Sequence, residues 1–545
     1  MTRPSSLPAF AFALAAISAL SAGCATFHPL VSPGEGGAAW TELKTAHFVL
    51  KTDLDPADAQ AVARKLEDTF AELADLGFPS EDKPKETIDV VYFRHRESYV
   101  QFAPQLTGAL FNPGGFHDFE RRSTALIGGS YDERVRENVQ HELTHRFIHY
   151  YYPQAPVWLN EGFAQYLEVL EVEGGTAIVG RALLKSRFWR GDWGTRSGTI
   201  LLPIDQAPTL AQLRAMPPTE FYKNRSADPR TSEGRVGALQ IQIHYQAAWA
   251  LVHFLLESPT YSAAFREYLD RLHAGEPDKT AWDGTVGSVA PDEKLEADYK
   301  VALAPLEVTT LRTKYTPPPV AEPQVRSMSD AEVHLLWARM RDWNNPKAHA
   351  AAEEDIAAAK RAGPSSELAL VESVWRATNG DFAGARDELQ HAADAAPEDT
   401  RLWNALGWLT WRSDLHPGVT KATLHADLAP VVAKLSPIAT SASELDLLAH
   451  ASLYGGQPTA AIAYEKRAVK VDPNCLDCLE WAATAMLEKG LAREALEVAT
   501  FAEGLAPEGV RPMGLIDVAD RARAAAAKSP AAPTAPASVE SAQKP

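Results

Sequence analysis

The pattern of apolar and polar positions divides the chain into a first half that mixes strands with helices and a second half of alanine-rich helical patterns. In the first half a helical period over 55–76 lies between two strand-like apolar runs, at 48–50 and 88–93. A third strand-like run, at 124–127, precedes a long helical pattern over 131–152. The later helical patterns of this half are 244–257 and 261–273.

The helix predicted over 131–152 carries two histidines that can share one metal ion. His141 and His145 are four residues apart, so their imidazoles lie on one face, about 6 Å apart along the axis. Both can then bind one tetrahedral zinc ion. Glu142, next to the first histidine, is the candidate general base that takes a proton from the attacking water.

A second motif, Trp158 to Ala164, supplies the candidate third ligand. Glu161 follows His145 by sixteen residues and lies in a second helical pattern. A carboxylate on a helix packed against the first completes a site of two histidines and one glutamate, with an open fourth position for catalysis. His149 continues the histidine stripe, but it lies about 12 Å from His141 along the axis, too far to share the ion. We therefore expect one Zn²⁺ per chain.

These paired motifs resemble those of the gluzincin metallopeptidases. The run WLNEGFAQY is very similar to the second motif of the aminopeptidase N family, although the spacer before Glu161 is shorter and no Gly-Ala-Met-Glu-Asn stretch precedes the first motif. The closer match is to the peptidase MA-like domains of bacterial secreted proteins and lipoproteins. Over roughly 38–310 the resemblance implies an α+β thermolysin-like metallopeptidase domain. It implies peptide hydrolysis with His141, His145 and Glu161 as zinc ligands, and it does not imply aminopeptidase specificity.

Three less distinctive segments have candidate roles, and the resemblance suggests the first two of these roles. The strand at 124–127 corresponds to the gluzincin edge strand that pairs with the substrate backbone, or it is a plain core strand. Tyr245 heads a helix of related type and is the candidate oxyanion stabiliser, while a packed core tyrosine is the competing interpretation. Residues 174–237 are irregular and form either a lid over the cleft or a surface insertion.

The second half begins after the proline-rich stretch 316–326, which has the composition of a stiff, extended linker. Beyond it a Gly, Ala, Ala, Pro set recurs with identical internal offsets at three places: Gly380, Ala385, Ala392, Pro397; Gly456, Ala461, Ala468, Pro473; and Gly490, Ala495, Ala502, Pro507. The last two sets are 34 residues apart, and the pattern resembles the tetratricopeptide repeat. We expect three to five helix pairs, all-α, that bind a protein partner in a groove or only buttress the first domain.

The first residues are typical of a secretion signal. Arg3 precedes an apolar run over 9–20, and small residues lead to Cys24, the candidate lipidation site. An ordinary cleaved signal with an incidental cysteine is the alternative. Ala25 after the cysteine resembles lipoproteins sent to the outer membrane, so we expect a lipid-anchored protein on its periplasmic face.

Charge and cysteine content exclude several other classes. The net charge of −18 disfavours nucleic acid and electrostatic binding to anionic membranes, which leaves the lipid anchor as the expected membrane contact. Three cysteines cannot form a disulfide framework. Cys475 and Cys478 lack a second ligand pair for zinc, so two packed thiols are expected, with a local disulfide as the alternative.

The sequence thus predicts an envelope-anchored zinc peptidase with helical repeats that recruit a substrate or partner. Two alternatives remain: a repeat-based assembly lipoprotein with a vestigial site, and a metal-dependent binding module without turnover. The first and second domains are expected to fold independently. The predicted divisions are a signal peptide at 1–23, a tether at 24–37, the metallopeptidase at 38–315, a linker at 316–326, repeats at 327–525 and a disordered tail at 526–545.

Overall fold

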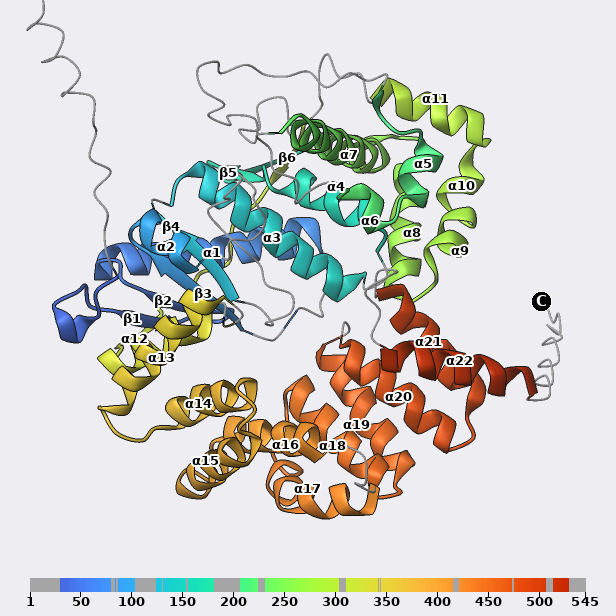
Figure 1. The fold of residues 1–545 in the computed structure, drawn as a ribbon. Coiled ribbons are helices and arrows are strands. Elements are labelled where there is room, and N and C mark those ends of the chain that lie inside the picture. Colours follow the sequence, from blue (N-terminus) through green and yellow to red (C-terminus); the bar gives the residue numbers. More distant parts are fainter. Residues whose placement is uncertain are drawn as a thin grey trace, which may run out of the picture.

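The structure is a computed structural model of the whole chain. It describes residues 30–79, 84, 87–102, 124–129, 131–152, 155–180, 206–223, 231–302, 310–341, 343, 345–414, 421–472, 475–505 and 513–528. An α/β first half lies against an arc of helices that runs from α12 to α22 (Figure 1). Cys24 and the tail beyond 528 lie outside the described residues. No described helix combines the length and the apolar character needed to cross a membrane.

A mixed sheet forms one end of the first half. Its order is β4-β3-β2-β1-β8, with β2, β3 and β4 parallel and with β1 antiparallel to both of its neighbours. The strands are β1 (Thr41–Lys44), β2 (Phe48–Thr52), β3 (Ile88–Phe93), β4 (Thr124–Gly128) and β8 (Gln324–Ser327). The predicted strands at 48–50, 88–93 and 124–127 are all present, and β4 is an edge of this sheet among the described strands.

Helices pack on the sheet and on one another to form the rest of the first half. Those before the small second sheet are α1 (Pro56–Glu72), α2 (Arg96–Phe102), α3 (Glu133–Tyr151) and α4 (Val157–Leu167). That sheet contains β5 (Glu171–Glu173), β6 (Thr176–Val179) and β7 (Leu311–Lys314). The later helices are α5 (Leu210–Ala215), α6 (Pro218–Phe221), α7 (Ser232–Glu257), α8 (Ser262–His273), α9 (Asp278–Asp283), α10 (Val286–Val289) and α11 (Asp292–Ala302). One continuous apolar core joins α1, α3, α4, α7 and α8.

The segment 174–237 is more regular than the sequence suggests. It contains β6, α5, α6 and the first turns of α7, while 181–205 and 224–230 lie outside the described residues. Leu213 and Phe221 from α5 and α6 are buried in the main core. The described part of this segment therefore belongs to the body of the domain.

The proline-rich stretch is not a free linker, which corrects the predicted domain boundary. Residues 324–327 form β8 and pair with β1 in the first sheet. Arg326 bonds both carboxylate oxygens of Glu42, at 2.9 and 2.8 Å. Glu322 accepts a hydrogen bond from Arg64 of α1 at 2.8 Å. The proline content supplied the extended conformation, and the backbone groups of 324–327 then paired with the open side of β1.

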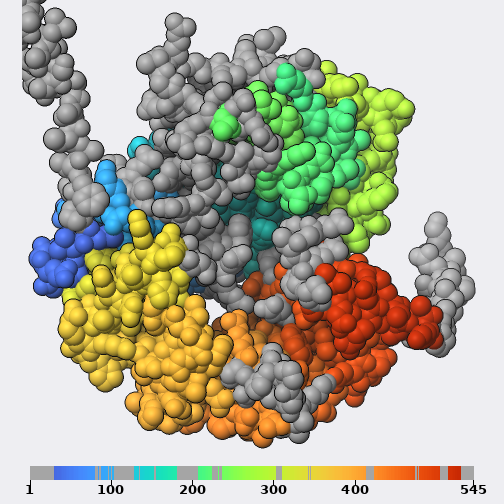
Figure 2. Space-filling model, in the orientation of Figure 1, coloured from blue at the N-terminus to red at the C-terminus, as the bar shows by residue number. Residues whose placement is uncertain are grey.

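Helix α12 (Asp330–Met340) continues this attachment and joins the two halves. On one side Trp337 packs with Trp40 and Phe102, at ring-centroid distances of 6.3 and 6.5 Å. On the other side Leu335 and Ala338 pack into the first repeat core. The first helix of the second half is thus part of both cores, which argues against the expectation that the two halves fold independently. In the space-filling view the yellow part of the chain, which includes α12, adjoins the blue N-terminal part (Figure 2).

The second half is an array of antiparallel helix pairs, as the repeat pattern predicts. Its further helices are α13 (Pro346–Lys360), α14 (Ser366–Thr378), α15 (Phe382–Ala395), α16 (Thr400–Asp414), α17 (Lys421–Leu435), α18 (Ala442–Tyr454), α19 (Pro458–Val471), α20 (Leu476–Glu488), α21 (Ala492–Leu505) and α22 (Met513–Lys528). Gly380, Gly456 and Gly490 join paired helices with positive φ angles of 84°, 73° and 81°, which explains the recurrent glycine. The middle pair, α16 and α17, accounts for the longer interval between the first and second sets.

One expectation about the cysteines is corrected. Cys475 and Cys478 form a disulfide at the start of α20 instead of two packed thiols. Cys475 precedes the first helical residue, and its sulfur accepts a hydrogen bond from the amide of Cys478. The N-cap turn brings the two Cα atoms to 5.2 Å, within the usual range for a disulfide.

Candidate metal centre

Helix α3 carries the two histidines on its buried face. Asp132 caps it by accepting a hydrogen bond from the amide of Val135 at 3.0 Å, and Tyr151 ends it. Phe147 and Ile148 fix the rotation of the helix because both are fully buried in the main core. The histidines, which precede these anchors by about one and two turns, therefore face α4 and not solvent.

Helix α4 presents Glu161 to α3, and its sequence explains how. Trp158 is fully buried, stacked on Tyr268 and edge-on to Trp282. On the side facing α7, Gly162 has no room for a side chain, since a Cβ there would lie 2.6 Å from both the carbonyl oxygen of Ala248 and a methyl group of Val252. The tryptophan and the glycine of the motif thus hold α4 in a fixed position between α3 and α7.

The two helices bring His141, His145 and Glu161 together. The Nε2 atoms of the histidines lie 3.5 and 3.6 Å from Oε2 of Glu161. The imidazole rings are perpendicular, with centroids 4.7 Å apart. All three side chains are buried, and one ligand atom from each lies within 4.8 Å of the others.

Each histidine is oriented by a second residue of the α4 region. Nδ1 of His141 is 2.9 Å from Oε2 of Glu168, and Nδ1 of His145 is 2.9 Å from the side-chain oxygen of Asn160. When each Nδ1 donates a hydrogen in this way, the Nε2 atom of each ring is the one on the side of Glu161 that can bind a metal ion. Neither partner was identified from the sequence, although Asn160 adjoins Glu161 and Glu168 lies seven residues after it, on the same helical face.

The electrostatics of the centre favour positive charge between these side chains. Burial opposes protonation of His141, but its contacts with the carboxylates of Glu161 and Glu168 outweigh burial and raise the pKa of His141 well above its ordinary value. Burial raises the pKa of Glu161, yet the charge of His145 and the contacts with His141 and Tyr222 lower it to about 2. Burial raises the pKa of Glu168. The carboxylates that favour a proton here also favour a metal cation.

Tyr222 is a site residue that the sequence did not reveal. Its hydroxyl donates a short hydrogen bond to Oε1 of Glu161 from the turn after α6. The predicted Tyr245 lies on α7, half-buried, with its ring edge-on to Phe221 at a centroid distance of 5.5 Å. Glu142 is half-buried on α3. The proposed roles of Tyr245 and Glu142 stay predictions.

The donor set fits zinc. Bonds of about 2.0–2.2 Å in a tetrahedral arrangement place ligand atoms about 3.3–3.6 Å apart. The 3.5 and 3.6 Å separations match this spacing and are too long for strong hydrogen bonds. Oε2 of Glu161 is buried and accepts no hydrogen bond from the described residues, which leaves it available as a ligand.

His149 is half-buried further along α3, and burial lowers its pKa to about 4.

The second half of the molecule defines a class: an array of tetratricopeptide-like helix pairs. No family model matches the sequence, and no curated protein matches it. Among solved structures, MamA MSR-1 C2 is 16% identical with a TM-score of 0.25, over 32% of this chain and 92% of that one. Cut9 in the APC/C hetero-tetramer Cut9-Hcn1 is 14% identical with a TM-score of 0.29, over 53% and 51%. The TPR domain of P58(IPK) is 13% identical with a TM-score of 0.21, over 56% and 88%. At these scores nothing about activity or partner transfers to this chain.

Proposed function

We propose that the protein is a zinc-dependent peptidase whose helical repeats recruit a protein partner or substrate. The observation that carries the proposal is the convergence of His141, His145 and Glu161, with Nε2 to Oε2 distances of 3.5 and 3.6 Å. Two imidazoles and one carboxylate are the ligand set of a catalytic zinc site, which keeps one position open.

When bound, zinc lowers the pKa of an attacking water and stabilises the negative charge that develops on the scissile carbonyl. The chain supplies the remaining functions. Glu142 takes the proton from the water and passes it to the leaving amine. Glu168 and Asn160 hold the histidine tautomers, and Tyr222 holds Glu161. Tyr245 is the proposed oxyanion donor.

The repeats support the recruitment part of the proposal. Tetratricopeptide-like arrays expose an extended surface suited to peptide or protein binding. The proposed location is the cell envelope through lipid on Cys24, and it rests on the sequence before that residue. A scaffold whose metal centre does not turn over is the second candidate, favoured by the large share of the chain given to repeats.

The deciding experiment separates metal binding from chemistry. Purified protein should contain about one zinc at the catalytic centre, and His145→Ala or Glu161→Ala should remove it. Glu142→Gln has the same shape but cannot accept a proton, so this variant should keep zinc while peptide hydrolysis falls at least ~100-fold. A wild type that holds zinc yet cleaves nothing in a random peptide mixture would favour the scaffold. Equal hydrolysis by Glu142→Gln would remove Glu142 from the mechanism.

A further inference from the structure

The junction of α18, α19 and α20 buries a set of side chains with strong metal-ligating chemistry. The set, here called the Asp446 cluster, comprises Asp446 and His450 of α18, Glu465 of α19, and the Cys475–Cys478 disulfide. No member is more than 4% exposed. It lies in the repeat half and takes no part in the metal centre on α3.

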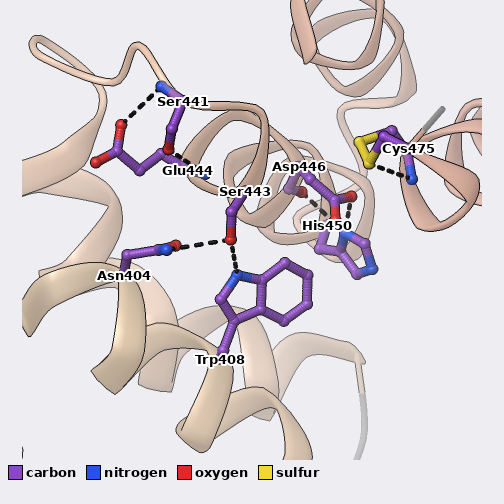
Figure 3. The surroundings of a disulfide bond; sticks show 9 residues. Asn404, Trp408, Ser441, Ser443, Glu444, Asp446, His450 and Cys475 are labelled. Carbon is purple, nitrogen blue, oxygen red and sulfur yellow. Dashed lines mark hydrogen bonds and ion pairs between the residues drawn. A yellow bond between two sulfur atoms is a disulfide. The ribbon is translucent and has the colours of Figure 1, made fainter. Parts of the chain in front are cut away.

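The cluster contains two overlapping groups of ligand atoms. Asp446, His450 and Glu465 each place one ligand atom within 4.8 Å of the others, and Asp446 does the same with the two sulfurs. Asp446 is therefore common to a nitrogen–oxygen group and a sulfur–oxygen group. Figure 3 shows its carboxylate and the His450 ring gathered beside the disulfide, with Oδ1 of Asp446 3.0 Å from Nδ1 of His450.

The repeat architecture does not require these residues. The position equivalent to Glu465 is Ala499 in the next unit and Leu389 in the first one, and both are buried and apolar. The position equivalent to Cys478 in the first unit is the fully buried Leu402. This unit thus replaces core hydrocarbon by a carboxylate and a sulfur, and both groups can act as metal ligands.

The charges in the cluster favour a divalent cation. Two buried carboxylates that lie close together repel each other, and one imidazole carries at most one positive charge. A divalent cation between them removes this repulsion and uses all three groups as ligands. The His450 ring is already held in place, packed on Trp481 at 4.0 Å and edge-on to Trp411 at 4.6 Å between centroids.

We propose that the Asp446 cluster is a second metal site, for a zinc-class divalent ion, whose affinity is set by the redox state of Cys475 and Cys478. A dithiol reductant transfers two electrons and two protons to the disulfide and leaves as a disulfide itself. The two thiols then lose their protons to solvent as the ion binds, and their thiolates join Asp446, the residue common to both groups, as ligands. Thiolate ligands favour zinc over harder cations, so the reduced protein binds zinc more tightly than the oxidised protein.

Cobalt(II) in the full chain tests the proposal independently of activity. His145→Ala disables the centre on α3, whose ligands contain no sulfur. After anaerobic reduction with a dithiol and desalting, we expect about one cobalt per chain and a near-ultraviolet thiolate-to-cobalt absorption band that zinc abolishes. The oxidised protein should lack the band and bind at least ~10-fold more weakly.

Two variants in the same background control the result. Cys475→Ser with Cys478→Ser keeps the size of the side chains, so it should stay folded by circular dichroism, lose the band and retain only the weak binding. Asp446→Asn removes the ligand common to both groups, so it should abolish the absorption band and the weak cobalt binding as well. A reduced, folded protein with no band and no gain in affinity would overturn the proposal. An equal band from the double cysteine variant would do so too.

Discussion

Tyr222 and Tyr245 are two tyrosines with different expected roles, one in holding a zinc ligand and the other in stabilising the oxyanion. The hydroxyl of Tyr222 donates a hydrogen bond to Glu161, whereas the ring of Tyr245 packs against Phe221. Tyr222→Phe should therefore weaken zinc affinity about 10-fold, because one carboxylate oxygen of Glu161 loses its fixed partner. Competition with a chromogenic chelator measures this.

Tyr245→Phe is the matched control and should leave zinc affinity unchanged. If it acts as oxyanion donor, kcat falls without a change in metal content. Identical zinc affinity in wild type and Tyr222→Phe would show that the hydroxyl contributes nothing to metal binding.

Glu72 provides a pH dependence away from the metal centre. Burial raises its pKa, Arg136 opposes this, and the neighbouring Asp68 and Glu171 add to the rise, so its pKa is about 7 instead of 4.5. The folded state then holds the proton more tightly than the unfolded state. The stability this contributes is complete below about pH 4.5 and is lost as pH rises through about 7.

Glu72→Gln keeps the neutral form at every pH. Between about pH 5 and pH 8 the wild type should lose about 2–3 kcal/mol of unfolding free energy relative to this variant. Urea unfolding of both proteins at the two pH values measures it, with the exposed Glu173→Gln as control. Parallel pH dependences of wild type and Glu72→Gln would contradict the raised pKa.

For single residues, the sequence predicts relative positions when both residues lie on the same helix. The spacing of His141 and His145 places them on one face by helical geometry alone. Tyr222 lies 61 residues from Glu161, and no local pattern connects them. Such contacts depend on how separate elements pack, which hydrophobic periodicity does not encode.

Among the elements, the crossing of α4 and α7 depends on one absent side chain. Gly162→Ala would drive a Cβ to 2.6 Å from the backbone of Ala248 and from Val252. The helices must separate, so we expect a loss of about 1–3 kcal/mol and weaker zinc retention, because Glu161 is the preceding residue. Thermal unfolding with metal analysis checks both.

Gly514→Ala on α22 is the matched control. Its Cβ would meet the end of the flexible Glu480 side chain, which can move aside. That variant should be close to neutral, since Gly514 is the second residue of α22 and the nearest atoms all belong to the Glu480 side chain. A Gly162→Ala protein as stable as the wild type would mean that α4 and α7 can shift without cost.

The elements themselves follow from the sequence better than their partners do. Recurrent small residues predict the helix pairs because two helices that cross closely need them at fixed positions. The same reasoning fails for 316–326, where proline content indicates an extended chain but not the open side of β1 that it joins. It also fails for Cys475 and Cys478, whose bond depends on the N-cap turn that precedes α20.

For the whole molecule, the position of a truncation should decide whether the first half survives. A chain of residues 30–314 lacks β8 and α12, which uncovers β1 and the aromatic cluster of Trp40, Phe93 and Phe102. Each large side chain exposed costs about 1.5–3 kcal/mol, so this chain should aggregate or melt at a much lower temperature. A chain of residues 30–363 keeps α12 and α13 and should stay soluble with its zinc. Equal stability of the two chains would restore the independent-domain prediction.

Because α12 belongs to two cores, it also fixes the distance between the repeats and the metal centre. A flexible linker would let the repeats sample many distances from the metal centre, and bound substrates would be presented over a broad range. Here Trp337 packs with Trp40 and Phe93 of the first half, while Leu335 packs into the first repeat core. The two halves therefore cannot rotate freely about this connection. A substrate anchored on the array would be cleaved at a set number of residues from its anchor. The repeats would then set the position of cleavage, and the cleavage products would have a narrow range of lengths.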